Sequence, residues 1–131
     1  MADMIQFDLV SPEKRLASFE AASVQIPGVD GDLTAMAGHS PVITTLRPGI
    51  VRVQSAEGET DYVVVAGFVE VTAESVSVIA ERAHAGDEVR KEDLDDVLAE
   101  ARAKAAEAEG EHKDGAEKLV SDLVELMDRM D

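Results

Sequence analysis

The chain contains no cysteine and no tryptophan, and it has only one Tyr and three Phe among its 131 residues. Without cysteine it can form neither a disulfide framework nor a cysteine-ligated zinc site, and thiol catalysis is excluded. With so few aromatic residues, the core must be built from aliphatic side chains. No apolar stretch approaches the roughly 20 residues that a membrane-spanning helix needs, so we expect no direct membrane insertion. The amino-terminal residues lack the basic end and apolar run of a signal peptide, so we expect the chain to stay in the compartment where it is made.

Basic residues are also scarce, because 12 Lys and Arg stand against 28 Asp and Glu and give a net charge of −16. Binding to phosphate groups requires clustered Lys and Arg, so this balance argues against a nucleic-acid partner. The same charge disfavours docking on an anionic lipid surface. A basic protein partner is compatible with it.

Residues 1–86 alternate between apolar and polar side chains over short runs, as in Ile5, Phe7 and Leu9. A period of two predicts half-buried strands, and the continuous apolar run at 62–66 predicts a strand covered on both faces. Turn residues recur at short intervals between these runs, which is typical of an antiparallel sandwich or barrel. The run at 15–26 lacks Pro and Gly, so we expect one long strand there.

From residue 87 onward the apolar spacing becomes helical, with a polar interruption at residues 110–115. This pattern predicts two helices joined into a hairpin, with the break in that interval. The first helix has an Ala-rich stripe, which buries little area, and the segment carries 16 acidic and 7 basic residues. We therefore expect residues 87–131 to be a weakly held, mobile arm. The apolar positions are Leu94, Val97, Leu98, Ala101, Ala105, Ala108, Leu119, Val120, Leu123, Val124, Leu126, Met127 and Met130.

Candidate catalytic or metal-binding residues are few. His39 stands beside Ser40, but sequence neighbours rarely form a nucleophile–base pair, and the G-x-S-x-G motif of hydrolases is absent. His84 and His112 lack the further ligands that a metal site requires. Asp32 lies in a Gly-rich turn that lacks the full calcium-loop pattern. We therefore expect no catalytic residue, no metal site and no cofactor, and we interpret His39 as part of a shaped loop.

Three short motifs follow one another in residues 27–49: Pro27-Gly28-x-x-Gly31-Asp32-Leu33, Gly38-His39-x-Pro41 and Leu46-x-Pro48-Gly49. In this order and spacing the chain resembles the epsilon subunits of bacterial F-type ATP synthases, which are homologous to mitochondrial delta subunits. The resemblance covers the whole chain. It implies an all-β N-terminal sandwich of about ten short antiparallel strands over residues 1–86, followed by a C-terminal α-helical hairpin over residues 87–131.

The resemblance also implies a function. The chain would be a non-catalytic rotor subunit of the central stalk, which couples proton-driven rotation of the membrane ring through the gamma subunit to ATP synthesis. Its sandwich would bind the gamma subunit and the ring of c subunits, and its tail would reach the alpha/beta catalytic head. The expected location is the cytoplasmic face of the bacterial inner membrane, as a peripheral protein. The residues expected in the docking loops are Asp32, Gly38, His39, Ser40 and Pro41.

The helical tail departs from the family pattern in two ways. Some members bind ATP through an I/L-D-x-x-R-A motif, but here Ala99 takes the place of the Asp, although Leu98, Arg102 and Ala103 match. This departure implies weak or absent ATP binding. The stretch from residue 117 has only Lys118 and Arg129 as basic residues, where the family uses basic groups to hold acidic surfaces of the catalytic head. We therefore expect weak inhibition of ATP hydrolysis.

Two other readings remain open on the residues alone. One is a stand-alone β-sandwich module that binds protein and carries a helical interaction tail. The other is a small hydrolase that uses His39 with an acidic residue. The order of the motifs favours the rotor subunit over both.

Overall fold

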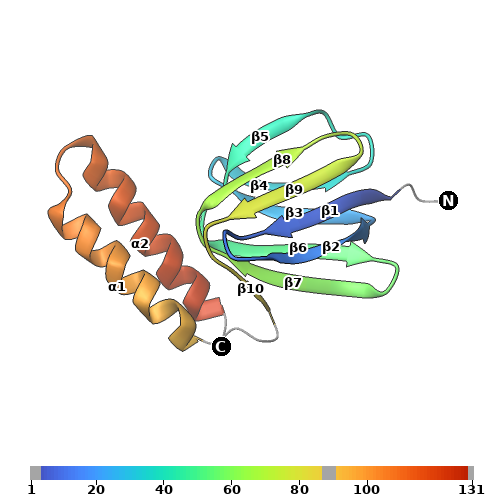
Figure 1. Cartoon of the computed structure of the whole chain (residues 1–131). Coiled ribbons are helices and arrows are strands. Elements are labelled where there is room, and N and C mark those ends of the chain that lie inside the picture. Colours follow the sequence, from blue (N-terminus) through green and yellow to red (C-terminus); the bar gives the residue numbers. More distant parts are fainter. Residues whose placement is uncertain (1–3, 87–90, 130–131) are drawn as a thin grey trace. The chain divides into compact units, whose positions relative to one another are not determined.

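The computed structural model describes residues 4–86 and 91–129 (Figure 1). Contacts between residues divide the chain into two compact units, Met1–Glu88 and Val89–Asp131. Among the described residues, no helix combines the length and the apolar character needed to cross a membrane.

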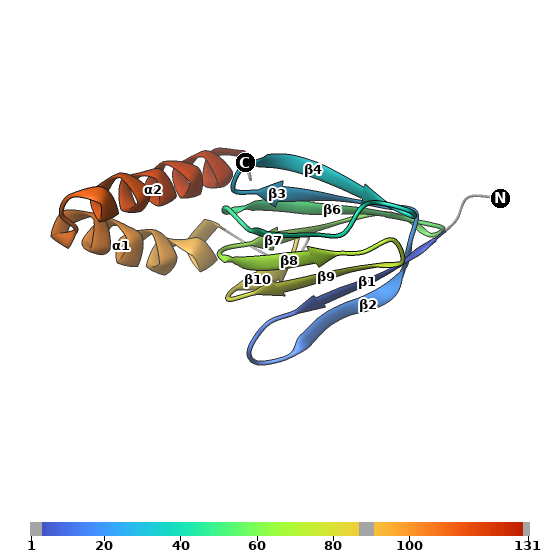
Figure 2. The same cartoon turned by 90° about the horizontal axis from the view of Figure 1, so that it is seen from above.

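The first unit is a β-sandwich of two five-stranded sheets, which lie face to face in Figure 2. The first sheet has the order β2-β1-β9-β8-β5, and the second has the order β10-β7-β6-β3-β4. Neighbouring strands are antiparallel except for β1 and β9, which run parallel. The predicted sandwich of about ten short strands is therefore confirmed, with one parallel pair that the sequence did not indicate. The strands are β1 Ile5–Val10, β2 Arg15–Ala21, β3 Ser23–Gly28, β4 Gly31–Met36, β5 Val42–Thr45, β6 Gly49–Ser55, β7 Gly58–Val64, β8 Gly67–Val71, β9 Ser75–Ala80 and β10 Ala83–Ala85.

The core between the sheets is formed by the inward-facing half of each alternating run. Ile5, Phe7 and Leu9 on β1 are each at most 1% exposed, while the residues between them reach the surface. Most of the core is Val, Ile, Leu and Ala, as the shortage of aromatic residues predicts. Phe7 supplies the central ring, whose centroid lies 5.5 Å from that of Phe19 and 5.9 Å from that of Tyr62. Of the apolar run at 62–66, residues 62–65 are buried as expected, but β7 ends at Val64 and Ala66 is half-buried.

The prediction of one long strand over residues 15–26 is wrong. β2 ends at Ala21 in the first sheet, and β3 begins at Ser23 in the second. Ala21 and Val24 are both 0% exposed, and a continuous strand would point residues three apart to opposite faces. The chain therefore bends at Ala22, whose N–H donates to the carbonyl of Gln54 at 2.7 Å, and crosses to the other sheet.

The second unit is a hairpin of α1 (Lys91–Glu107) and α2 (Glu111–Arg129), which contact each other. The predicted two-helix hairpin is confirmed, but its break does not extend over residues 110–115. α1 ends at Glu107, the break ends at Gly110, which has a φ of 63°, and the polar residues after it form the first turn of α2. The buried side chains are Leu94, Val97, Ala101, Leu123 and Leu126.

Candidate docking site

The loop of residues 37–41 connects β4 to β5 and contains four of the five residues that the sequence assigned to docking. The N–H of His39 donates to the carbonyl of Met36 at 3.1 Å, which closes a four-residue turn. Gly38 is the third residue of that turn and has a φ of 85°, which side chains with a Cβ rarely adopt. The loop therefore has a defined shape, and Gly38 is required for it.

The ring of His39 braces the same loop. Its Nδ1 lies 2.6 Å from the carbonyl oxygen of Ser40, and because a carbonyl only accepts, Nδ1 carries the proton. This bond uses one ring nitrogen inside the loop and leaves Nε2 as the nitrogen that can contact a partner. His39 is half-buried, whereas Ser40 and Pro41 are exposed. The geometry suits a shaped contact loop, and His39 contributes to its shape.

Asp32 lies apart from this loop, because it is the second residue of β4 whereas the loop follows the other end of the strand. It forms an ion pair with Arg47, although its own side chain is 72% exposed. Arg47 also donates from Nε to the carbonyl of Gly28 at 3.2 Å and from its backbone N–H to Pro27 at 3.0 Å. Asp32 and Arg47 therefore join the β3–β4 turn to the segment between β5 and β6.

An exposed apolar face, consisting of Ile43, Phe68 and Ile79, adjoins the loop and was missed in the sequence. These side chains are 68%, 45% and 36% exposed. Phe68 pairs directly with Ile79 across β8 and β9 and with Thr45 across β8 and β5. Ile43 follows the loop by two residues, whereas Phe68 and Ile79 lie toward the ends of β8 and β9 that are away from the β8–β9 turn. A signal existed, because Phe68 is out of step with the inward-facing Val69 and Val71.

The residues compared with an ATP-binding motif lie on α1. Leu98 is half-buried, and Ala99, Arg102 and Ala103 are exposed. The methyl group at Ala99 offers no hydrogen-bond acceptor to a polar ligand.

The remaining histidines lie far from each other in the sequence and on different elements. His84 lies on β10 opposite Val63, and His112 is in the first turn of α2. Within residues 4–86 and 91–129, no group of three or more His, Cys, Asp or Glu is placed to hold a metal ion.

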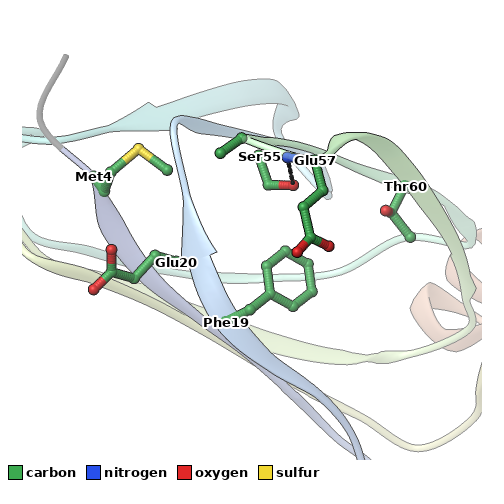
Figure 3. A pocket seen from close by; sticks show the side chains of 7 residues that line it. Met4, Phe19, Glu20, Ser55, Glu57 and Thr60 are labelled. Atoms are coloured by element: carbon green, nitrogen blue, oxygen red, sulfur yellow. Dashed lines mark hydrogen bonds between the residues drawn. The ribbon is translucent and has the colours of Figure 1, made fainter. Parts of the chain in front are cut away.

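A cavity of about 350 Å³ opens between β2 and the β6–β7 turn (Figure 3). Its lining includes none of the residues singled out in the sequence. The hydroxyl of Ser55 donates to the carbonyl of Gly58 at 3.2 Å and accepts the N–H of Glu57 at 3.3 Å. Both bonds stabilise the β6–β7 turn. The cavity therefore lacks an activated nucleophile. Its lining is Met4, Phe19, Glu20, Ser55, Ala56, Glu57 and Thr60.

A cross-strand ion pair lies on the outer face of the second sheet. Arg52 Nε is 3.1 Å from Asp61 Oδ1 and 3.2 Å from Glu59 Oε1. The hydrogen bond and negative charge of Asp61, followed by the charge of Glu59, raise the pKa of Arg52. This cluster pairs β6 with β7 and has no part in the loop or the apolar face.

Comparison with known proteins identifies what this fold is similar to. Residues 4–86 match the family described as the beta-sandwich domain of the ATP synthase delta/epsilon chain. An ATP synthase epsilon chain of Cereibacter sphaeroides (strain ATCC 17025 / ATH 2.4.3) is 54% identical over 126 residues, which cover 96% of each chain. That of Fuscovulum blasticum is 58% identical over 123 residues, which cover 94% of this chain and 93% of the relative.

Solved structures give the same fold. A chain in the Euglena gracilis mitochondrial ATP synthase, in a structure of OSCP, F1 and c-ring, is 25% identical with a TM-score of 0.72. The match covers 96% of this chain and 80% of that one. A chain in the central stalk and c-ring of the Tetrahymena thermophila mitochondrial ATP synthase is 16% identical with a TM-score of 0.69. It covers 97% of this chain and 96% of that one, and at this identity it supports the fold alone.

Proposed function

Since the chain belongs to the family of ATP synthase epsilon chains, we propose that it docks on the gamma subunit and the ring of c subunits as part of the rotor. The subunits of this family are non-catalytic. In this role the chain would help to couple proton-driven rotation of the ring to ATP synthesis. The match to the family and to its relatives confirms the family resemblance that the three motifs indicated.

The observation that carries this proposal is the exposed apolar face beside a loop of fixed shape. Ile43 and Phe68 lie on an outer sheet surface, where water would otherwise favour polar side chains. Phe68 and Ile79 are cross-strand neighbours there, while Ile43 pairs with the exposed Glu70. Exposed apolar residues at such a position are typical of a protein–protein contact, and an aromatic residue is typical of its energetic centre. The loop of residues 37–41 adds polar and backbone groups at the border of the face.

The charge of the chain defines the partner surface further. With a net charge of −16, the chain attracts a surface that carries Lys and Arg, and this attraction accelerates and orients docking. Relatives named as epsilon chains come from bacteria, which supports a peripheral position on the cytoplasmic face of the inner membrane. The Euglena structure, which includes F1 and the c-ring, supports a place in the rotor.

The helical hairpin is proposed to act as a weak regulatory arm toward the alpha/beta catalytic head. Ala101 on α1 contributes a small side chain to the buried positions, so a modest free-energy difference would separate docked and extended states. Ala99 provides no carboxylate for ATP, and we propose weak or absent ATP binding. α2 has few basic residues, such as Lys118, so it offers few positive charges to an acidic surface of the catalytic head.

A pull-down tests the rotor assignment against the alternative of a stand-alone binding module. The tagged full chain is expressed in its source in place of the untagged chain, the membranes are solubilised in detergent, and the proteins that bind with the tag are identified by mass spectrometry, with the tag alone as control. Recovery of stalk, ring and catalytic subunits together is expected. If the intact ATP synthase is in the extract but does not bind, the rotor proposal is wrong.

A further inference from the structure

The turn between β8 and β9 holds the loop of residues 37–41 through a backbone hydrogen bond. The N–H of Gly38 donates to the carbonyl of Ala73 at 2.9 Å. Both segments lie at the same end of the sandwich (Figure 1). Resting on the docking role proposed above, we propose that the β8–β9 turn positions this loop for its partner, and that Thr72 is the positioning residue.

Packing does not hold the loop at Gly38. A Cβ placed on Gly38 would meet no atom within 4 Å, so neither neighbouring side chains nor backbone fill the space beside it. Ala37 packs against the core, but at Gly38 the conformation depends on hydrogen bonds. The bond from His39 to Met36 and the ring bond of His39 are local, whereas the bond from Gly38 to Ala73 connects these residues to a distant part of the sheet.

The side chain of Thr72 fixes the direction of the Ala73 carbonyl. Its Oγ1 accepts the N–H groups of Glu74 at 3.2 Å and Ser75 at 3.0 Å, and it shares a hydrogen bond of 2.9 Å with the hydroxyl of Ser75. The backbone N–H of Thr72 also donates to the carbonyl of Ser75 at 2.8 Å. Ala73 lies inside this set of bonds, so its peptide cannot rotate freely.

The turn is itself fixed to the sandwich. The N–H of Gln6 on β1 donates to the carbonyl of Glu74 at 3.0 Å, and Val71 and Val76 on either side are 0% exposed. A chain of bonds therefore runs from the buried strands through the turn to the loop. Because a preorganised loop loses less conformational entropy on binding, a defect in the turn weakens docking without removing any contact.

Three substitutions in the full chain separate this role from simple loss of stability. Thr72→Val keeps the shape of the side chain but removes the hydroxyl, whereas Thr72→Ser retains the hydroxyl. Ser55→Ala is the matched control, since Ser55 braces the β6–β7 turn in the same manner but has no bond to the loop. Amide hydrogen exchange at Gly38 reports the support of the loop, and exchange at Leu9 reports the core.

In T72V we expect exchange at Gly38 to rise about tenfold, because tenfold corresponds to about 1.4 kcal/mol, the size of one hydrogen bond. Exchange at Leu9 should stay nearly unchanged. We expect affinity for the ATP synthase stripped of this subunit to fall by a similar factor, with T72S restoring both values and S55A affecting neither.

Three outcomes overturn the inference, and they differ from one another. If Gly38 exchange is the same in T72V and wild type, the turn does not support the loop. If Gly38 exchange rises and His39→Ala weakens docking but T72V does not, the support has no role in binding. If neither H39A nor T72V changes the affinity, the docking role of the loop is wrong, and the positioning role is rejected together with it.

Discussion

Replacing Phe68 by Ala tests the apolar face directly. Phe68 points outward from β8, is 45% exposed, and pairs with Thr45 and Ile79 rather than with the core. Its loss should weaken binding and also destabilise the fold, because more than half of the side chain is covered by its neighbours on the sheet. If a whole Phe side chain presents about 200 Å², the covered part is about 110 Å², and at about 25 cal/mol per Å² this gives an upper estimate of about 3 kcal/mol in the free energy of unfolding.

The expected loss of affinity follows from the area that a partner would cover. A Phe side chain presents about 200 Å², so the exposed part is about 90 Å². At about 25 cal/mol per Å² this corresponds to about 2 kcal/mol, or roughly 30-fold in Kd. The Ala methyl group retains part of this area, so the value is an upper estimate.

The assay titrates wild-type and F68A chains onto ATP synthase that lacks this subunit. Gln25→Ala is the control, because Gln25 is exposed on the outer face of the other sheet. It should bind as the wild type does. If F68A folds normally and binds within about twofold of wild type, the partner does not cover about 90 Å² of the Phe68 side chain. The face would then not be covered in the complex, and the central observation for the rotor contact would be lost.

Four further outcomes are expected. Gly67→Ala should destabilise the sandwich in urea by about 3 kcal/mol or more, because a Cβ at φ 128° would collide with the backbone oxygen of Ile79. Ala66→Gly should stabilise it by about 0.5 kcal/mol, since relief of the left-handed conformation at φ 63° exceeds the entropy cost of Gly. Calorimetry should detect no ATP binding by the wild-type chain at millimolar ATP, whereas Ala99→Asp should introduce it. Removal of residues 87–131 should leave ATP hydrolysis by the assembled complex nearly unchanged, and a several-fold rise would contradict weak inhibition.

The period of the apolar residues predicts an antiparallel sandwich or barrel followed by a helical hairpin, and the family resemblance selects the sandwich. Alternation at Ile5, Phe7 and Leu9 fixed which face of β1 is buried, because a strand places alternate residues on the same side. Even the crossing at Ala22 was readable, since buried residues change from odd to even positions between Ala21 and Val24. The absence of Pro and Gly over residues 15–26 does not exclude such a crossing.

The features that depend on long-range pairing could not be predicted in the same way. The motif around Gly38 indicated a shaped loop, but no local pattern says that Ala73 receives its N–H. The alternation of Phe68 with Val69 and Val71 indicates an outward position for Phe68, but only strand pairing shows that Ile79 lies beside it. The local sequence pattern around a side chain that contacts a partner is the same as that around a side chain that packs in the core.

The net charge of the chain limits self-association through the exposed apolar face. β5 is an edge strand with Ile43 exposed, and such an edge can pair with another copy of the same chain. The strand spans only Val42–Thr45, which limits that pairing. Two copies that each carry a net charge of −16 also repel one another, whereas a basic surface is attracted to the same face. The acidic residues thus disfavour self-association and select for a basic partner, so an apolar face can stay exposed until that partner arrives.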